Sequence, residues 1–215
     1  MKVTVTTSWD DGHVQDERLA KTLARHNVHG TFYIAPYNRE IPEHERLSDA
    51  RVLELSKQFE IGAHTMTHPH LTKVPLDAAR DEILGSKKHL ERVTGKEVKS
   101  FCYPAGYYND DIREIVKDAG FTAARTVQQG SRRIQDPLLM PTTVHAYNHW
   151  WHFGMPWDEL AILSFDATLR EGGVFHLWGH SWEINLFAHW EKLERVLAHI
   201  GNREGVTYAT NSQLV

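Results

Sequence analysis

Short apolar runs alternate with amphipathic segments along the whole chain. Residues 3–9 alternate in polarity and are rich in β-branched side chains, which predicts a strand. Similar runs predict further strands at 30–34, 60–63, 98–103, 121–127, 138–145, 173–178 and 206–209. Apolar residues spaced three or four apart predict helices between them, at 16–27, 48–58, 77–94, 109–119, 157–170 and 186–200.

This alternation indicates an α/β fold. Repeated βα units give parallel strands with helices packed outside them. Seven or eight such units favour a barrel over an open sheet. No linker, low-complexity stretch or internal repeat divides residues 1–215, so we expect a single domain. Pro141 lies within the run 138–145 and predicts an edge strand or a bulge there.

The composition is that of an ordinary globular protein. Of 215 residues, 41% are hydrophobic and 24% charged, and the formal net charge of −4 gives no basic footprint for nucleic acid or anionic lipid. Cys102 is the single cysteine, which excludes zinc sites built from several thiolates. No apolar stretch reaches the roughly 20 residues of a membrane span, and no signal-peptide pattern is visible. We therefore expect a cytoplasmic protein, with a homo-oligomer left open.

Two adjacent carboxylates end the first predicted strand. Neighbouring side chains on a regular strand point to opposite faces, but Gly12 follows Asp10 and Asp11 and predicts a turn that brings both to one side. Two like charges held this close need a proton or a cation between them. The simpler alternative is an ordinary turn, in which one carboxylate binds its own backbone.

Two histidines follow the third predicted strand. His64 and His68 are four residues apart, so one turn of backbone can direct both rings to the same side. Zinc proteases with this spacing carry a glutamate after the first histidine, and Thr65 excludes that class. A pair of capping or surface histidines is the alternative. The carboxyl ends of parallel strands meet at one edge, and the neighbouring carboxylates therefore favour a metal site.

One carboxylate and two imidazoles suit zinc, iron or cobalt, with water in the open positions. Asp11, His64 and His68 can supply this set. A metal lowers the pKa of bound water toward about 7, and Asp10 is then free to accept its proton. Such a site hydrolyses an acyl or amide bond.

The ordered motifs resemble those of the polysaccharide deacetylase family, carbohydrate esterase family four. They read Ser8-Trp9-Asp10-Asp11-Gly12, His64-Thr65-Met66-Thr67-His68-Pro69, Tyr103-Pro104-Ala105-Gly106 and Leu177-Trp178-Gly179-His180. The resemblance extends from residue 3 to about residue 183. It implies a distorted (β/α) barrel of about seven strands and a divalent metal ion, for which zinc is the expected identity.

The resemblance also implies roles for single residues. Asp10 matches the catalytic base, and His180 matches the general acid that protonates the departing amine. The matching metal ligands are Asp11, His64 and His68.

Further matches concern the oxyanion and the acyl group. A backbone N–H near Tyr103, in the turn with Pro104, would help to hold the oxyanion. Leu177 or Trp178 would line the small pocket for the acyl group.

Two family features are missing from the sequence. Cys102 and Ala105 stand where the third motif usually has an arginine and an aromatic residue. In the family that arginine pairs with the base and with an aspartate of a fourth motif, which we do not find in this chain. Arg125 is the candidate to take the place of the arginine beside Asp10.

These features predict a metal-dependent hydrolase of C–N bonds that removes an acetyl or formyl group from an amino sugar. One alternative is a ring-opening amidohydrolase of the allantoinase-like branch, which can work without a metal. Another is a glycan-binding barrel without turnover. The complete ligand set argues against the first, and the presence of base, ligands and acid together argues against the second.

Overall fold

The computed structural model describes residues 2–215 and has eight strands and seven α-helices in that range. The strands are β1 Val3–Asp11, β2 Gly30–Ile34, β3 Glu60–Ala63, β4 Ser100–Cys102, β5 Ala123–Arg125, β6 Val144–His145, β7 Gly173–Gly179 and β8 Val206–Tyr208. The helices are α1 Asp16–Arg25, α2 Asp49–Leu55, α3 Leu76–Thr94, α4 Asp110–Asp118, α5 Trp157–Glu171, α6 Ser181–Leu186 and α7 Trp190–Ile200. All strand pairs are parallel, in the order β5-β4-β3-β2-β1-β7-β6, with β8 beside β1. The distorted (β/α) barrel is confirmed.

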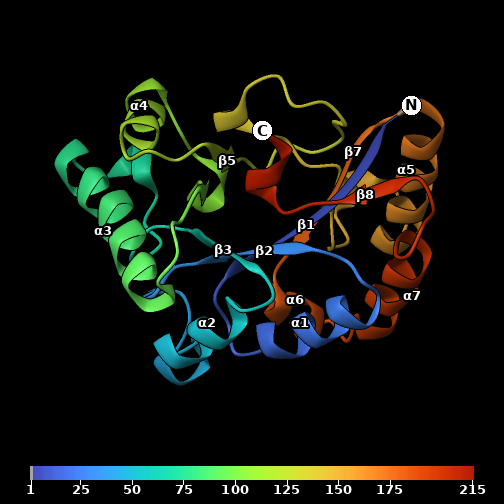
Figure 1. Ribbon diagram of the computed structural model, residues 1–215, viewed down its shortest axis with the longest axis horizontal. Helices are drawn as coiled ribbons and strands as arrows, with labels where there is room; N and C mark the ends of the chain where they lie inside the picture. Colours follow the sequence, from blue (N-terminus) through green and yellow to red (C-terminus); the bar gives the residue numbers. More distant parts are fainter. Residues whose placement is uncertain (1) are drawn as a thin grey trace.

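Helices surround the curled sheet. Figure 1 shows α3 and α4 on one side of it and α5 and α7 on the other, with β1 between them. The outer face of the strands is apolar, and Phe175 of β7 packs on Phe165 of α5 with 5.5 Å between ring centroids. The inner face is polar, and Ser8 Oγ of β1 lies 2.8 Å from Nε2 of the buried His176. Side-chain alternation along each strand therefore separates a helix-packing face from a polar interior.

The predicted strand 138–145 is broken. It begins as a 3₁₀ turn, Pro137–Leu139, and only Val144–His145 pairs with β7. Between these parts Met140 forms a bridge to β5, and Pro141, which has no N–H to donate, follows it. The segment thus touches β5 at one end and β7 at the other, and it closes the barrel.

The predicted helix 186–200 is wrong in its first part. The chain instead forms two helices, α6 and α7, and Ala188 between them has a left-handed φ of 54°. The sequence pattern did not predict α6, which carries residues of the candidate site. Within residues 2–215, no helix combines the length and the apolar character needed to cross a membrane.

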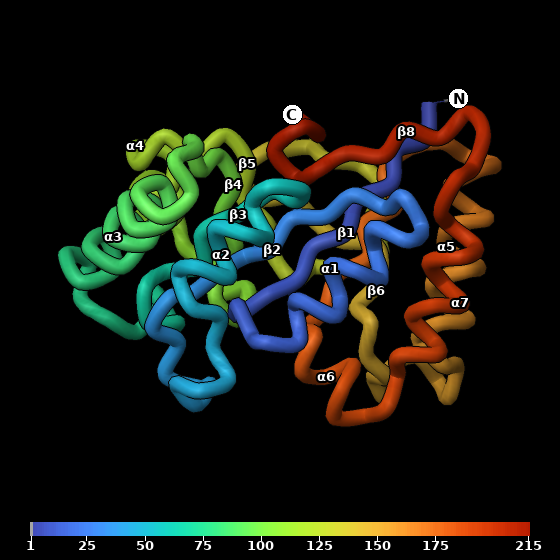
Figure 2. The backbone as a smooth tube through the Cα atoms, turned by 60° about the horizontal axis from the view of Figure 1, so that its bottom comes forward, coloured from blue at the N-terminus to red at the C-terminus, as the bar shows by residue number. Residues whose placement is uncertain are grey.

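The carboxyl-terminal turn fills the end of the barrel at which the strands begin. Asn211 is fully buried there and accepts a hydrogen bond from Thr6 Oγ1 at 2.9 Å. Its amide donates to the Tyr33 hydroxyl at 2.9 Å, and its backbone N–H donates to Thr31 Oγ1 at 2.9 Å. Figure 2 shows β8, in red, beside the beginning of β1. With this end filled, the other end, where the strands have their carboxyl termini, is left for chemistry.

Candidate active site

The three predicted metal ligands come together at the carboxyl ends of β1 and β3. Asp11 Oδ1 lies 3.8 Å from His64 Nε2 and 3.6 Å from His68 Nε2. One ligand atom from each residue lies within 4.8 Å of the other two. A divalent ion with ligand bonds of about 2 Å requires donor atoms this close to one another. The donor types and their spacing therefore fit a zinc-type ion.

Several site residues have a left-handed backbone that is uncommon outside glycine. The φ angles are 85° at Asp11, 64° at Thr65, 61° at His68 and 51° at Ala105. Such conformations cost about 1–3 kcal/mol each and cluster at functional sites. Gly12 continues the first turn at a φ of 75°. The expected turn after the first strand is confirmed, and it brings both carboxylates into the site.

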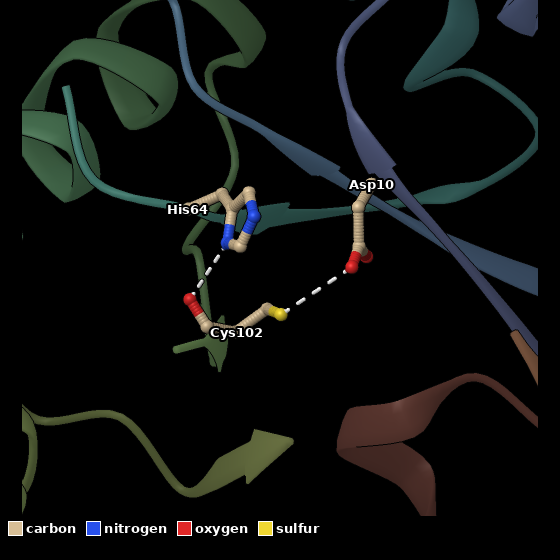
Figure 3. A group of neighbouring side chains, drawn as sticks. All are labelled: Asp10, His64 and Cys102. Carbon is tan, nitrogen blue, oxygen red and sulfur yellow. Dashed lines mark hydrogen bonds between the residues drawn. The ribbon is translucent and has the colours of Figure 1, made fainter. Parts of the chain in front are cut away.

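Each ligand imidazole directs its Nε2 toward Asp11, and a hydrogen bond at Nδ1 fixes the ring of His64 but not that of His68. His64 Nδ1 donates to the carbonyl oxygen of Cys102 at 2.7 Å (Figure 3). His68 Nδ1 lies 3.0 Å from a carboxylate oxygen of Glu40. Burial, with the neighbouring His68, lowers the pKa of His64 to about 4. The His64 ring is therefore neutral near pH 7 and available as a ligand.

A single carboxylate holds the loop that carries the histidines. Glu82 of α3 accepts the backbone N–H groups of Met66 and Thr67 at 2.8 Å each. Its other oxygen accepts the Thr67 hydroxyl at 2.6 Å. Glu82 was not predicted, because nothing in the sequence distinguishes it from the other acidic residues of its helix.

Asp10 is buried beside the ligand set and forms an ion pair with the fully buried Arg125. Arg125 Nη2 also lies 2.9 Å from Cys102 Sγ, and Cys102 Sγ lies 3.7 Å from Asp10 Oδ2 (Figure 3). Cys102 and Arg125 are register partners on β4 and β5. An arginine from the adjacent strand thus replaces the one missing at Cys102, as expected.

Charge and burial set the protonation of this group. Burial alone would raise the pKa of Asp10, but Arg125, together with His64 and His180, lowers it to about 2. Asp10 Oδ1 is buried and has no hydrogen-bond partner among residues 2–215. Asp10 is therefore an ionised carboxylate with an unused acceptor atom. Burial raises the pKa of the Cys102 thiol, so it stays protonated and is not a nucleophile.

The predicted acid lies on the other side of Asp11 and has its own carboxylate partner. His180 Nε2 lies 3.9 Å from Asp11 Oδ2, and its Nδ1 donates to Glu183 Oε2 at 2.6 Å. The same Glu183 oxygen lies 3.1 Å from His145 Nε2. Burial would lower the pKa of His180, but Glu183 and the aspartates outweigh it and raise the pKa to about 9. His180 therefore carries a proton near pH 7.

A sequence model of the polysaccharide deacetylase family matches residues 2–124. The chain belongs to this family. Two Bacillus cereus proteins named peptidoglycan-N-acetylglucosamine deacetylase are similar in sequence. One is 29% identical over 107 residues, which are 49% of this chain and 37% of the relative. The other is 36% identical over 67 residues, which are 31% of each. The chain thus spans only about a third of the length of these relatives.

Solved structures share the fold. A Mycobacterium smegmatis protein assigned as a polysaccharide deacetylase has a TM-score of 0.77 at 18% identity, covering 99% of this chain and 88% of that one. The CE4 domain of a xylanase from the hindgut metagenome of Trinervitermes trinervoides has a TM-score of 0.63 at 14% identity, covering 100% and 90%. A mutant of a CE4 family pseudoenzyme has a TM-score of 0.65 at 18% identity, covering 99% and 67%. At these identities the likeness concerns the fold alone.

Two residues of this polysaccharide deacetylase that were predicted to lie near the acyl group have other contacts in the structure. The N–H of Tyr103 itself donates to the carbonyl oxygen of Arg125 at 3.1 Å, and an oxyanion donor near Tyr103 stays a prediction. Leu177 shares the outer strand face with Phe175 and lies in the apolar core. It therefore lies on the face of β7 opposite to Trp178, and a contact of either residue with the acyl group stays a prediction.

Trp178 and Pro104 are closer to their predicted places. Trp178 is on the inner face of β7, where the Arg125 guanidinium lies 4.6 Å from its ring centroid and His145 stacks on it at 3.8 Å. Pro104 is buried and begins the 3₁₀ turn that contains Ala105. Whether these residues contact substrate stays a prediction.

A carboxylate and an indole that were not predicted lie at the site, although Glu183 contacts His180 and His145 and not Arg125. Glu183 and Trp182 lie directly after the His180 motif, on α6, and supply a carboxylate and an indole at the site. The run Ser181-Trp182-Glu183 is visible in the sequence. Its place at the site could not be predicted, because helix α6 was not predicted.

Proposed function

We propose that this polysaccharide deacetylase is a metal-dependent hydrolase that removes an acetyl or formyl group from the nitrogen of an amino sugar. The observation that carries the proposal is the arrangement of a base and an acid on two sides of one ligand set. Asp10, paired with Arg125, is the neighbour of Asp11 in β1. On the other side of the ligand set, His180 Nε2 lies 3.9 Å from Asp11 Oδ2.

The ligand set would hold the metal through Asp11, His64 and His68. A zinc-type ion held there supplies Lewis acidity toward the acyl carbonyl and makes water a nucleophile near neutral pH. Asp10 accepts the proton of the attacking water on its unpartnered Oδ1. The Arg125 partner keeps Asp10 ionised and fixed in place.

The acid side completes the reaction. His180 donates its Nε2 proton to the nitrogen as the C–N bond breaks, since an amine leaves poorly as an anion. Glu183 holds the opposite Nδ1–H and stabilises the protonated ring. The water proton ends on Asp10 and the histidine proton on the amine, and the acyl group leaves as the carboxylic acid.

An amino-sugar substrate is supported by the family and by the relatives that carry the name of an N-acetylglucosamine deacetylase. Exposed aromatic side chains near the site supply stacking surface for a sugar ring. Trp151 stacks on His149 at 3.9 Å between centroids, and His149 Nε2 lies 2.8 Å from Nδ1 of His145.

The alternatives predict different results. One protein with a similar fold is a CE4 family pseudoenzyme. A glycan-binding barrel without turnover is therefore the rival proposal. Arg125 and Glu183 argue against it, because they restore partners for base and acid that the motifs lack. A ring-opening amidohydrolase of the allantoinase-like branch would not need the complete ligand set.

The deciding experiment measures metal content together with acetate and formate release from a panel of N-acylated amino sugars, with allantoin as the ring-opening substrate. We expect about one zinc-type ion per chain, release from an amino sugar and loss of release with a chelator. Activity that persists in metal-free protein contradicts the mechanism. We also propose that the protein acts in the cytoplasm, and cell fractionation tests this.

A further inference from the structure

Two neutral N–H groups hold the two oxygens of Asp11. Asn38 Nδ2 donates to Oδ1 at 3.2 Å, and Trp182 Nε1 donates to Oδ2 at 2.9 Å. Oδ1 is the oxygen that both ligand imidazoles approach. Neither donor was among the site residues predicted from the sequence.

Asn38 is fixed by the chain around it. It is fully buried, and its Oδ1 accepts the N–H of Glu40 at 2.9 Å. Its neighbours bind the histidine loop, since Tyr37 N–H donates to the Met66 carbonyl at 2.8 Å. The segment after β2 is thus joined to the loop between the two ligand histidines, and the Asn38 amide has little freedom to move.

Trp182 reaches Asp11 from the other side of the site. It lies on α6 between His180 and Glu183, and its ring centroid is 5.2 Å from that of His180. The indole N–H is a donor only, so its single polar contact is used on Asp11. Helix α6 therefore carries both Glu183, which binds the predicted acid His180, and Trp182, which binds the predicted metal ligand Asp11.

The hydrogen-bond donors to the two aspartates differ in charge, while the protonated His180 ring lies farther off, at 3.9 Å from Asp11 Oδ2. Asp10 is paired with the cation of Arg125, whereas the two donors to Asp11 are neutral. A neutral donor orients a carboxylate and leaves its negative charge available, while a guanidinium compensates that charge. This difference favours Asp11 over Asp10 as the place for an added cation.

We propose that Asn38 and Trp182 are positioning residues that hold Asp11 in its ligand conformation and set the affinity of the site for a divalent metal. The inference rests on the proposed function, because that proposal puts a metal at Asp11. Asp11 has a strained backbone beside a second carboxylate, and its side chain needs support from outside its own strand. Partners that orient metal ligands typically change metal affinity about 10- to 100-fold.

The test measures zinc affinity by competition with a chromophoric chelator, without any substrate. Trp182→Phe removes the N–H and keeps most of the ring, and Asn38→Leu removes the donor at nearly the same shape. Trp190→Phe is the matched control, because the Trp190 indole N–H also donates to a side chain, Asn185 Oδ1 at 3.2 Å, and not to Asp11, His64 or His68. We expect a dissociation constant about 10- to 100-fold larger for the first two variants and no change for the control.

The outcomes separate the two proposals. Zinc binding by Trp182→Phe and Asn38→Leu within about twofold of wild type overturns the positioning role and leaves the metal site intact. A wild-type protein that binds zinc no better than His64→Ala contradicts the proposed function itself. If Trp190→Phe weakens zinc binding as much as Trp182→Phe does, the loss of any indole contact perturbs the site. That result also overturns the specific role of Trp182 and Asn38. If Asn38→Leu does not fold, Trp182→Phe alone decides.

Discussion

Arg125 and Asp10 form a buried ion pair between strands that are four places apart in the sheet. The guanidinium comes from β5, next to the β4 position where the sequence pattern calls for an arginine and Cys102 stands. The same positive charge therefore reaches the same carboxylate from a neighbouring backbone. Side-chain length and register, which motif spacing does not encode, make this exchange possible.

Moving the arginine back tests this relationship. Arg125→Ala leaves Asp10 buried without its partner, so we expect it to lose about 3–5 kcal/mol of stability and nearly all activity. Cys102→Arg in the same chain returns the guanidinium from β4 and should recover part of both. Chemical denaturation and an acyl-release assay measure the two effects. Arg113→Ala, which breaks a half-exposed pair with Asp136, is the control and should behave like wild type.

Variants at Asp10 and His64 are expected to lose activity for different reasons. Asp10→Asn removes the proton acceptor and keeps the ligand set, so we expect normal zinc content with acyl release reduced about 10²- to 10⁴-fold. His64→Ala removes a ligand and should lose both zinc and activity. Metal analysis of the purified variants beside the same assay gives both readouts. Full zinc content in His64→Ala would show that the assigned ligand set is wrong.

Glu183→Gln separates the acid side from the rest of the site. An amide needs a proton on its leaving nitrogen, whereas an aryl acetate leaves as a stable phenolate. We expect amide hydrolysis to fall about 10²- to 10⁴-fold, with aryl acetate hydrolysis close to wild type. Asp10→Asn is the comparison, because loss of the base should slow both substrates. Parallel losses on both substrates in Glu183→Gln would refute its role in supporting His180.

The His180–Glu183 pair also predicts a pH dependence of stability in metal-free protein. The pKa of His180 rises from 6.5 to about 9 on folding, so its contribution is complete below 6.5 and lost as pH rises through about 9. The pKa of Glu183 falls from 4.5 to about 2, so its contribution is complete above 4.5 and lost as pH falls through about 2. The pair therefore stabilises most between 4.5 and 6.5.

Urea denaturation of chelator-treated protein measures this effect. Between about pH 6 and about pH 9.5 we expect the wild type to lose on the order of 1–3 kcal/mol from His180. Glu183→Gln should start lower and lose less over the same interval. An identical pH profile for the two proteins would contradict the assigned cause of the shift.

The sequence predicted that Asp11, His64 and His68 come together because they lie within two short motifs, each at the end of a strand. His64 and His68 are separated by a single turn, and Asp10 and Asp11 are neighbours. Arg125, Asn38 and Trp182 act across the barrel or between loops, and only Arg125 was suspected. Their contacts depend on which strands pair and where α6 begins, and local pattern does not determine either.

Leu177 shows the limit of motif matching in another way. Adjacent strand residues face opposite sides, so a motif that names Leu177 and Trp178 together cannot assign both to the pocket. The register of β7 with β1 places Trp178 on the inner face of the barrel and Leu177 on the outer face.

The position of β1 has a consequence for folding during synthesis. Residues 3–9 pair with β7, residues 3–5 pair with β8, and residues 7–11 pair with β2. One edge of β1 therefore stays unpaired until β7, Gly173–Gly179, has been synthesised. Such long-range pairing slows folding and leaves a strand edge open to association with other chains. A chain cut before residue 173 should accordingly accumulate as aggregate, and its need for a chaperone would come from topology alone.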